Sequence, residues 1–139
     1  MVCPQNHPLF FVAKQIDVSL VNLNNGESDV IVDGLSRSFM LDYHYSSGYL
    51  YWIDISQATI SRISYPLINE NLPELIIPEE SGHRPTDIVI DYIHNHIYWA
   101  DSYDFSILRS ELDGSDKKTI LKDDAISEIR GIAMDVLNG

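Results

Sequence analysis

Residues 87–110 read "DIVIDYIHNHIYWADSYDFSILRS", and residues 38–63 read "SFMLDYHYSSGYLYWIDISQATISRI". The two stretches share one order of features. A short apolar strand ends in Asp, a turn leads to the motif Tyr-Trp-x-Asp, and a second turn leads to an Ile strand with Arg near its end. Repetition at this spacing indicates an array of similar structural units. The shared residues are Asp42, Tyr51, Trp52, Asp54 and Arg62 in one copy, and Asp91, Tyr98, Trp99, Asp101 and Arg109 in the other.

Two further copies extend the repeat toward both ends. The stretch "GIAMDVLNG" begins a copy, with Asp135 at the place of Asp91. Near the other end, "LFFVAK" stands where the Tyr-Trp-x-Asp strand is expected, and "DVSLVNLNNG" stands for the strand after it. The predicted units are a degenerate first blade at about 8–37, blades at about 38–85 and about 86–130, and the start of a next blade at 131–139.

The segments between turn signals are short and rich in β-branched and aromatic residues, which favours strands over helices. Examples are "YLYWI", "ELIIP", "HIYWA" and "KKTIL". Turn signals such as Asn25-Gly26, Ser47-Gly48 and Asp113-Gly114 separate them. Four strands in a repeat of roughly 40–50 residues are typical of one blade of a β-propeller. The predicted fold class is therefore all-β, with four-stranded antiparallel blades.

Alternation along a strand predicts a role for the repeated motif. Neighbouring side chains point to opposite faces, so the two tryptophans are expected on one face and the two tyrosines on the other. Asp54 and Asp101 end their strands, where a carboxylate accepts hydrogen bonds from loop N–H groups or from an arginine. Arg62 and Arg109, one strand later, are the expected arginine donors. The motif is therefore interpreted as structural rather than catalytic.

Composition limits the classes of partner. The chain has 139 residues, about one ordinary domain. Its 9 basic and 21 acidic residues give a net charge of −12. This charge disfavours nucleic acid and anionic membrane surfaces, which attract lysine and arginine. It suits a protein partner with a basic patch, although the same charge can serve solubility alone.

Cys3 is the single cysteine, so no disulfide forms within the chain, although a partner outside it is open. No stretch reaches the ~18 consecutive apolar residues of a membrane span. Residues 1–7 lack the basic and apolar regions of a signal peptide. If the protein is secreted, we therefore expect its true beginning to lie further upstream.

Few residues point to chemistry. His94 and His96 are both expected in the turn that links strand 87–91 to strand 97–101, but two histidines without a third ligand at a known spacing do not make a metal site. The stretch "DGSDKKTILKDD" lacks the ligand spacing of a calcium loop. Cys3 has no supporting context for a nucleophile. We therefore expect no catalytic residue, no metal and no cofactor.

Three stretches, "GIAMD", "IYWAD" and "ILRSELDGS", resemble the YWTD β-propeller of the low-density lipoprotein receptor and its related proteins. The resemblance covers essentially the whole chain. It implies about three blades of a six-bladed propeller, so we expect a fragment or a truncated gene model in preference to half of an assembly. Two copies depart from the motif, because Ile53 and Ala100 stand where the family has Thr or Ser.

The resemblance implies a non-catalytic, ligand- or module-binding segment on the extracellular side of a receptor, of the endocytic or the Wnt co-receptor type. A spacer propeller in a nidogen-like matrix protein stays open. A propeller hydrolase is a further alternative, which would need acidic ligands converging on the channel. Cys3 stands where the last cysteine of an EGF-like module is found in some relatives. Such a module, or a protein with a basic patch, is the expected partner.

By position in the family, the turn after each Tyr-Trp-x-Asp strand is expected to reach a propeller face. Charged and aromatic side chains on such a face are common anchors for a ligand. The resemblance also permits pH sensing in a turn, because receptors of this family release cargo in acidic compartments and histidine titrates in that range. The candidates are Lys14, Gln57, Tyr103 and Asp104 for ligand binding, and His94 and His96 for pH sensing.

Overall fold

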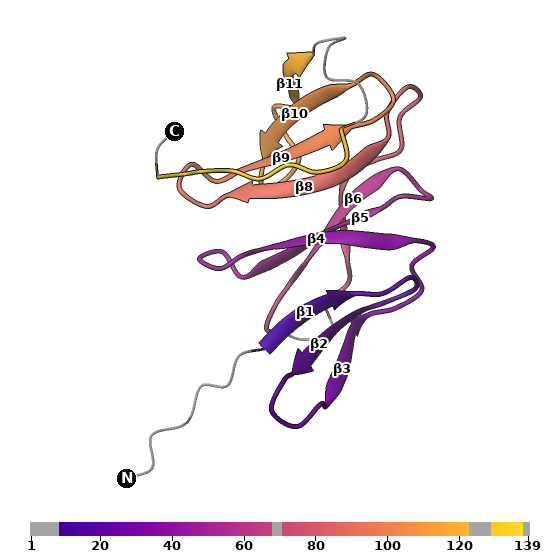
Figure 1. The fold of residues 1–139 in the computed structure, drawn as a ribbon, viewed down its shortest axis with the longest axis vertical. Helices are drawn as coiled ribbons and strands as arrows, with labels where there is room; N and C mark the ends of the chain where they lie inside the picture. The colour runs from indigo at the N-terminus through magenta and orange to yellow at the C-terminus, as the bar shows by residue number, and fades with distance from the viewer. Residues whose placement is uncertain (1–8, 68–70, 123–128, 138–139) are drawn as a thin grey trace.

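The computed structural model describes residues 9–67, 71–122 and 129–137. Within these ranges the regular elements are eleven β-strands, which form three antiparallel sheets (Figure 1). The all-β prediction is therefore confirmed. Cys3 lies outside the described residues. Among those described, no helix is long and apolar enough to cross a membrane.

Each sheet is built from consecutive strands that are hydrogen-bonded neighbours. The first sheet contains β1 (Leu9–Ala13), β2 (Val18–Asn22) and β3 (Ser28–Val32). The second contains β4 (Ser38–His44), β5 (Tyr49–Asp54), β6 (Thr59–Ser64) and β7 (Glu74–Ile77). The third contains β8 (Pro85–Asp91), β9 (His96–Asp101), β10 (Ser106–Glu111) and β11 (Lys118–Lys122). In Figure 1 the three sheets follow one another along the long axis, as successive blades do.

The strand registers show that the second and third sheets are two copies of one blade. Tyr51 pairs with Arg62 across β5 and β6, and Tyr98 pairs with Arg109 across β9 and β10. The same strand therefore carries the Tyr-Trp-x-Asp motif in both sheets, with the same neighbour on each side.

The register corrects one equivalence inferred from the repeat. Asp91 pairs with His96 at the end of β8, and the matching residue at the end of β4 is His44, which pairs with Tyr49. Asp42 therefore does not occupy the place of Asp91. The reason is that Asp42 lies two residues further from its Tyr-Trp pair than Asp91 does, so β4 continues beyond it.

The first sheet is a degenerate copy of the same blade. Its β-bulge places Val18 in β2 at the position of Ile60 in β6. Carrying this register across to β1 puts Phe11 at the place of Tyr51. Lys14, which follows β1, then stands where the other blades have the aspartate of the motif. The first blade therefore lacks the motif carboxylate that Asp54 and Asp101 supply in the other two blades.

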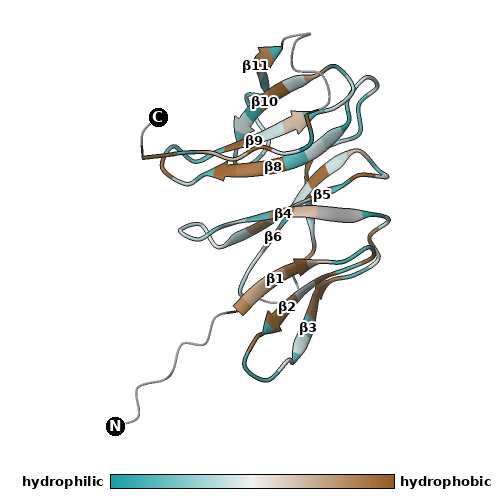
Figure 2. Ribbon diagram, in the orientation of Figure 1, coloured by the Kyte–Doolittle hydropathy of each residue, from teal (hydrophilic) through white to brown (hydrophobic). Residues whose placement is uncertain are grey.

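Alternation places the motif aromatics on opposite faces of their strand, as expected. Trp52 packs between the first and second sheets, with apolar residues of β2, β3, β5 and β6. Tyr51 packs between the second and third sheets, in one cluster with Trp99. Burial of such side chains contributes roughly 1.5–3 kcal/mol each. Figure 2 shows the corresponding pattern, with hydrophobic residues along the strands and hydrophilic ones in most of the turns.

Candidate interaction surface

One end of the molecule gathers three equivalent turns, on the right side of Figure 1. They comprise residues 14–17, 55–58 and 102–105, which follow β1, β5 and β9. The loops that link the sheets reach the same end. Ala58 (φ 52°) and Phe105 (φ 54°) both have a left-handed backbone at the last position of their turn. Two of the three turns therefore share one backbone shape and present different side chains on it.

Asp54 holds the turn after β5. Its Oδ1 accepts hydrogen bonds from the backbone N–H groups of Ser56 (3.1 Å) and Gln57 (3.2 Å). Its Oδ2 accepts a hydrogen bond from the N–H of Ser36 (2.9 Å), in the loop that enters the sheet. One buried carboxylate thus closes its own turn and ties that turn to the linking loop.

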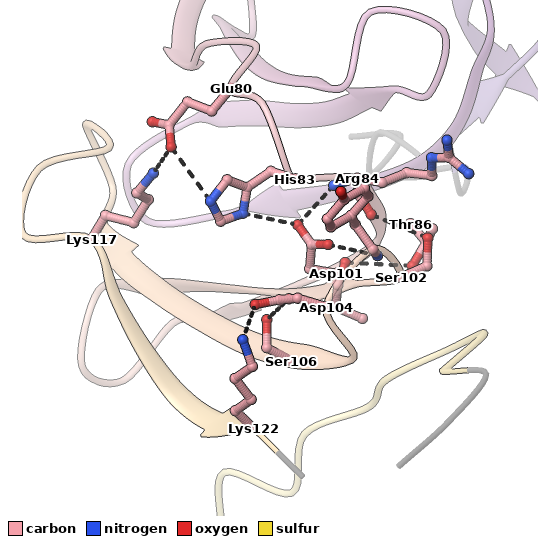
Figure 3. A network of polar contacts seen from close by, with 12 residues as sticks. Glu80, His83, Arg84, Thr86, Asp101, Ser102, Asp104, Ser106, Lys117 and Lys122 are labelled. Atoms are coloured by element: carbon pink, nitrogen blue, oxygen red, sulfur yellow. Dashed lines mark hydrogen bonds and ion pairs between the residues drawn. The ribbon is translucent and has the colours of Figure 1, made fainter. Parts of the chain in front are cut away.

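Asp101 repeats this arrangement after β9. Its Oδ1 accepts the N–H of Tyr103 (2.9 Å), and its Oδ2 accepts the N–H of Arg84 (2.8 Å). His83 adds a third contact, because its Nδ1 lies 3.3 Å from Asp101 Oδ2 (Figure 3). Hydrogen bonds to an ionised acceptor are stronger than those between neutral groups. The motif aspartates therefore bind loop N–H groups, which was the first of the two predicted alternatives.

A charged network continues from His83 and joins the second and third sheets (Figure 3). Glu80 Oε2 lies 3.6 Å from His83 Nε2 and 2.5 Å from Lys117 Nζ. The hydrogen bond from Lys117 is the main reason that the pKa of Glu80 falls below its ordinary value. Because Glu80 belongs to the linking loop and Lys117 precedes β11, the network connects neighbouring blades.

Three of the four predicted ligand-binding residues lie on this end with side chains that reach solvent. Tyr103 is exposed over 62% of its surface. Gln57 Nε2 donates a hydrogen bond to Ser36 Oγ (3.2 Å), and Lys14 Nζ lies 3.5 Å from Asp17 Oδ1. These contacts hold the side chains locally and leave them accessible.

Asp104 is the most engaged of the four. Its Oδ1 accepts a hydrogen bond from the Ser106 hydroxyl (2.5 Å), and its Oδ2 accepts one from Lys122 Nζ (3.0 Å). Burial of the carboxyl opposes ionisation, but the hydrogen bonds from Ser106 and Lys122 prevail and lower the pKa of Asp104. Its carboxylate is therefore already engaged in contacts within the third sheet, which makes it less available to a ligand.

His94 and His96 lie away from this surface. His94 lies in the turn between β8 and β9, as expected, whereas His96 is the first residue of β9 and pairs with Asp91, so its placement in the turn was wrong. His94 Nδ1 lies 2.7 Å from Asp91 Oδ2, and His96 Nε2 lies 3.4 Å from Glu111 Oε1. The two rings stack with their centroids 6.4 Å apart. Across the described residues, no group of three or more His, Cys, Asp or Glu side chains is placed to hold a metal. A pH-sensing role for the pair stays a prediction.

The motif arginines do not bind the motif aspartates, so that expectation is wrong. Arg62 Nη1 donates a hydrogen bond to the carbonyl oxygen of Leu112 (2.8 Å), and its Nε donates one to Glu74 Oε2 (2.8 Å). The Tyr51 hydroxyl donates to the same Leu112 carbonyl (3.1 Å). Arg62 lies beside Tyr51 on the face that meets the third sheet, whereas Asp54 lies at the end of its strand. The two side chains therefore serve different contacts.

Electrostatics differ between the two motif arginines. Burial of the Arg62 guanidinium works against its charge, but hydrogen bonds to Glu74 and Tyr51 prevail and raise the pKa of Arg62 further. Arg109 occupies the matching place in β10, and its Nε is buried without a hydrogen-bond partner among the residues that the structure describes.

Two inner-strand aspartates join successive blades in a way that sequence analysis did not foresee. Asp42 Oδ2 accepts the N–H of Ile90 (2.8 Å), and Asp87 Oδ2 accepts the N–H of Ile132 (2.7 Å). Asp42 was visible in the repeat, but its acceptor role depends on a strand of the next blade. The spacing of residues within one repeat therefore cannot predict this contact.

His44 and His83 were also missed as structural residues. His44 is buried, and its Nδ1 accepts the N–H of Ser47 (3.1 Å), just as Asp91 Oδ1 accepts the N–H of His94 (3.0 Å). The sequence did contain a signal for His44. The turns 45–48 and 92–95 have equal length and end at Gly48 and Asn95. Matching the turns, rather than the aspartates, aligns His44 with Asp91.

The sequence matches known proteins along the same stretches. Residues 95–136 match the family model of the low-density lipoprotein receptor repeat class B. Mouse low-density lipoprotein receptor-related protein 5 is 28% identical over 135 residues, covering 95% of this chain and 8% of that protein. Human low-density lipoprotein receptor-related protein 8 is 26% identical over 113 residues, covering 81% of this chain and 12% of that protein. Mouse nidogen-2 is 40% identical over 81 residues, covering 58% of this chain and 6% of that protein.

This chain thus spans a small part of each relative. The fold is similar to that of a chain solved in a nidogen/laminin complex, with a TM-score of 0.79 and 23% identity over 96% of this chain and 50% of that chain. The repeated motif, the blade registers and these matches together show that the chain is built of YWTD β-propeller blades, and that residues 95–136 carry the low-density lipoprotein receptor class B repeat.

Proposed function

We propose that the chain is a non-catalytic, ligand- or module-binding propeller segment of a receptor related to the low-density lipoprotein receptors, of the endocytic or the Wnt co-receptor type. The observation that carries the proposal is the end formed by turns 14–17, 55–58 and 102–105, where two turns of one shape, each held by a buried aspartate, and a third, different turn present varied side chains. Loops held on a rigid scaffold are frequent binding sites. Receptor-related proteins among the relatives support this role and an extracellular location.

The proposed partner is a protein with a basic patch or a neighbouring EGF-like module. The solved nidogen relative is in complex with laminin, which gives one protein partner for a chain of this fold. A net charge of −12 attracts a basic surface over distance, and salt screens that attraction. Binding is therefore expected to weaken as ionic strength rises.

A second candidate function is a spacer propeller in a matrix protein. The 40% identity to mouse nidogen-2 over 81 residues favours it. The two functions differ in whether the turn surface itself contacts a ligand, so a surface variant distinguishes them.

The test is a pull-down of secreted proteins on the immobilised chain, repeated with Tyr103→Ala and with Tyr92→Ala. Tyr92 is a matched control, because it is 56% exposed and lies in the turn between β8 and β9, away from the candidate surface. We expect Tyr103→Ala to lose a captured protein that Tyr92→Ala retains. Capture of no protein, or equal capture by all three chains, favours the spacer.

Acid release tests the histidine prediction separately. Histidine gains charge between about pH 7 and pH 5. We expect a captured protein to dissociate in that range, and the double variant His94→Gln, His96→Gln to retain it. Identical release by wild type and double variant removes these histidines from the mechanism.

A further inference from the structure

His83 lies between two carboxylates, one on each side of its imidazole ring (Figure 3). Its Nδ1 is 3.3 Å from Asp101 Oδ2, at the end of β9, and its Nε2 is 3.6 Å from Glu80 Oε2, in the loop that follows β7. The Asp101 side chain is fully buried, whereas the His83 side chain is 30% exposed. The ring therefore contacts a buried carboxylate and is still accessible to protons from solvent.

The number of N–H groups on the ring decides how many of these contacts it can make. A neutral imidazole has one N–H and can donate to one carboxylate at a time. The imidazolium has an N–H on each nitrogen, so it can donate toward both carboxylates at once. Contacts in which both partners are charged are also stronger than those of a neutral donor. Both contacts are therefore made together only when His83 carries a charge.

The other charged groups near the ring come from three segments and contact it less directly. Lys117, before β11, lies beyond Glu80, whose Oε2 is 2.5 Å from Lys117 Nζ. Asp104, in the turn after β9, is bound to Lys122 Nζ (3.0 Å). Arg84 is the next residue along the chain, and Figure 3 shows its guanidinium pointing away from the ring. Within the described chain, the direct charged contacts of the ring are therefore the two carboxylates.

The remaining neighbours of the ring are apolar. Ile77 of β7, Pro85 of β8 and Trp99 of β9 line a small hollow beside the imidazole of His83. These side chains offer the ring no hydrogen bond. Apolar surroundings also strengthen a contact between charges, because little water is present to screen it. A change in the charge of the ring therefore acts mainly on its two carboxylate contacts.

The loop that carries His83 also supports the candidate surface. At Gly82 the backbone has φ +83°, and a Cβ there would lie 3.5 Å from Tyr103 Cε1, so the Tyr103 ring packs against the residue before His83. The N–H groups of Tyr103 and Arg84 bind the two oxygens of Asp101 (2.9 Å and 2.8 Å). Asp101 thus connects the loop, the turn after β9 and the Tyr103 side chain.

We propose that His83 forms a pH-dependent joint between the loop that carries it and the turn after β9, and that its imidazolium holds the two together more firmly in mild acid than at neutral pH. Protonation completes the contacts to Asp101 and Glu80, and deprotonation releases one of them. Because the Tyr103 ring packs on this loop, the joint regulates how firmly the surface holds that side chain. This consequence for a ligand rests on the proposed function, whereas the joint itself is a contact between two blades.

The first measurement follows three NMR signals from about pH 8 to about pH 5, the range in which histidine titrates. They belong to the His83 ring, the Tyr103 ring and the Arg84 amide. We expect the Tyr103 and Arg84 signals to shift with the same midpoint as the His83 ring. In His83→Gln these shifts should disappear over that range, because glutamine keeps a polar side chain but gains no charge.

His94→Gln is the matched control for this titration. It removes a histidine that contacts Asp91 (2.7 Å) in the turn between β8 and β9, away from the candidate surface. The Tyr103 and Arg84 shifts should be unchanged in this variant. Wild-type signals that do not follow the His83 ring overturn the proposal, and so do shifts of equal size in His83→Gln.

The second measurement gives the size of the effect. Hydrogen exchange at the Arg84 amide is compared between His83→Gln and wild type at each pH, so that the intrinsic pH dependence of exchange cancels. We expect the ratio of the two rates to be about threefold to tenfold larger near pH 5.5 than near pH 8, because a charged contact at a partly exposed site is of modest strength. A ratio that is equal at both pH values, or smaller in acid, rejects the joint.

Both measurements use the chain without a ligand, so they separate the joint from the proposed function. Absence of the pH-dependent shifts, together with capture of a protein by the turn surface, would reject the joint alone. Intact shifts without capture of any secreted protein would reject the binding function and leave the joint in place.

Discussion

The guanidinium of Arg62 in β6 donates a 2.8 Å hydrogen bond to the carbonyl oxygen of Leu112, which directly follows β10 of the next sheet. The Tyr51 hydroxyl binds the same oxygen at 3.1 Å. Arg62 also lies 4.1 Å above the centre of the Tyr49 ring and binds Glu74. A half-buried donor that satisfies several groups at once specifies one geometry. The junction between these blades is therefore a directed contact in addition to an apolar one.

Arg62→Met is expected to lower the free energy of unfolding by about 2–3 kcal/mol, because it removes charged hydrogen bonds and leaves the half-buried Leu112 carbonyl with fewer donors. The matched control is Lys122→Met, since that lysine is 59% exposed and its ion pair is worth less than about 1 kcal/mol. Urea unfolding at neutral pH measures both. Equal losses would show that the Arg62 contact is no stronger than a surface ion pair.

Gly114→Ala is expected to lower the free energy of unfolding because a side chain at this position would clash with the neighbouring sheet. A Cβ at Gly114 would lie 2.3 Å from the carbonyl oxygen of Ile76, and the backbone there has φ +86°. Gly26→Ala is the matched control, because Gly26 also has positive φ (+73°) but nothing within 4 Å of a Cβ. The control should lose about 1–2 kcal/mol from backbone strain alone. Gly114→Ala should lose clearly more in the same urea titration, and a similar loss would mean that the turn moves aside.

The strands and their faces could be predicted from the sequence because they depend on local pattern. Trp52 and Tyr51 follow one another, so alternation alone sends them to opposite faces. The turn after Asp54 was predictable for the same reason, since a carboxylate at a strand end meets the N–H groups of the next few residues.

The contacts between blades could not be predicted in this way. The acceptor for Arg62 is a main-chain carbonyl 50 positions away, and any residue type at Leu112 would supply it. His44 takes over the turn-capping role of Asp91 with a different side chain, so a search for aspartate points to Asp42 instead. Every residue has a main-chain carbonyl, so the sequence does not show which carbonyls accept hydrogen bonds between blades.

Acid is expected to destabilise the fold through Asp91. Burial of this carboxyl opposes its ionisation, but hydrogen bonds from His94 and from the N–H of Ile93 prevail and lower its pKa. A lowered pKa in the folded state means that the stabilisation is complete above the unfolded value of about 4 and is lost as pH falls through the folded value. Asp91→Asn should therefore be less stable at pH 7, with a smaller further loss on acidification. Urea midpoints measured from neutral pH to about pH 3 test this, and parallel curves for the two proteins would contradict it.

Asp101 offers the sharpest test of how the candidate surface is held. Asp101→Ala removes the acceptor for the N–H groups of Tyr103 and Arg84 at a fully buried site, and it should cost about 3 kcal/mol. Asp104→Ala is the control, because the contacts of its carboxylate in the described part of the chain are with the side chains of Ser106 and Lys122, and it should cost about 1 kcal/mol. Hydrogen exchange at the Arg84 amide separates a local effect from a global one. Asp101→Ala should speed the exchange of this amide beyond what its loss of stability explains, whereas Asp104→Ala should not. An Arg84 amide that stays protected in Asp101→Ala would mean that other contacts hold the linking loop.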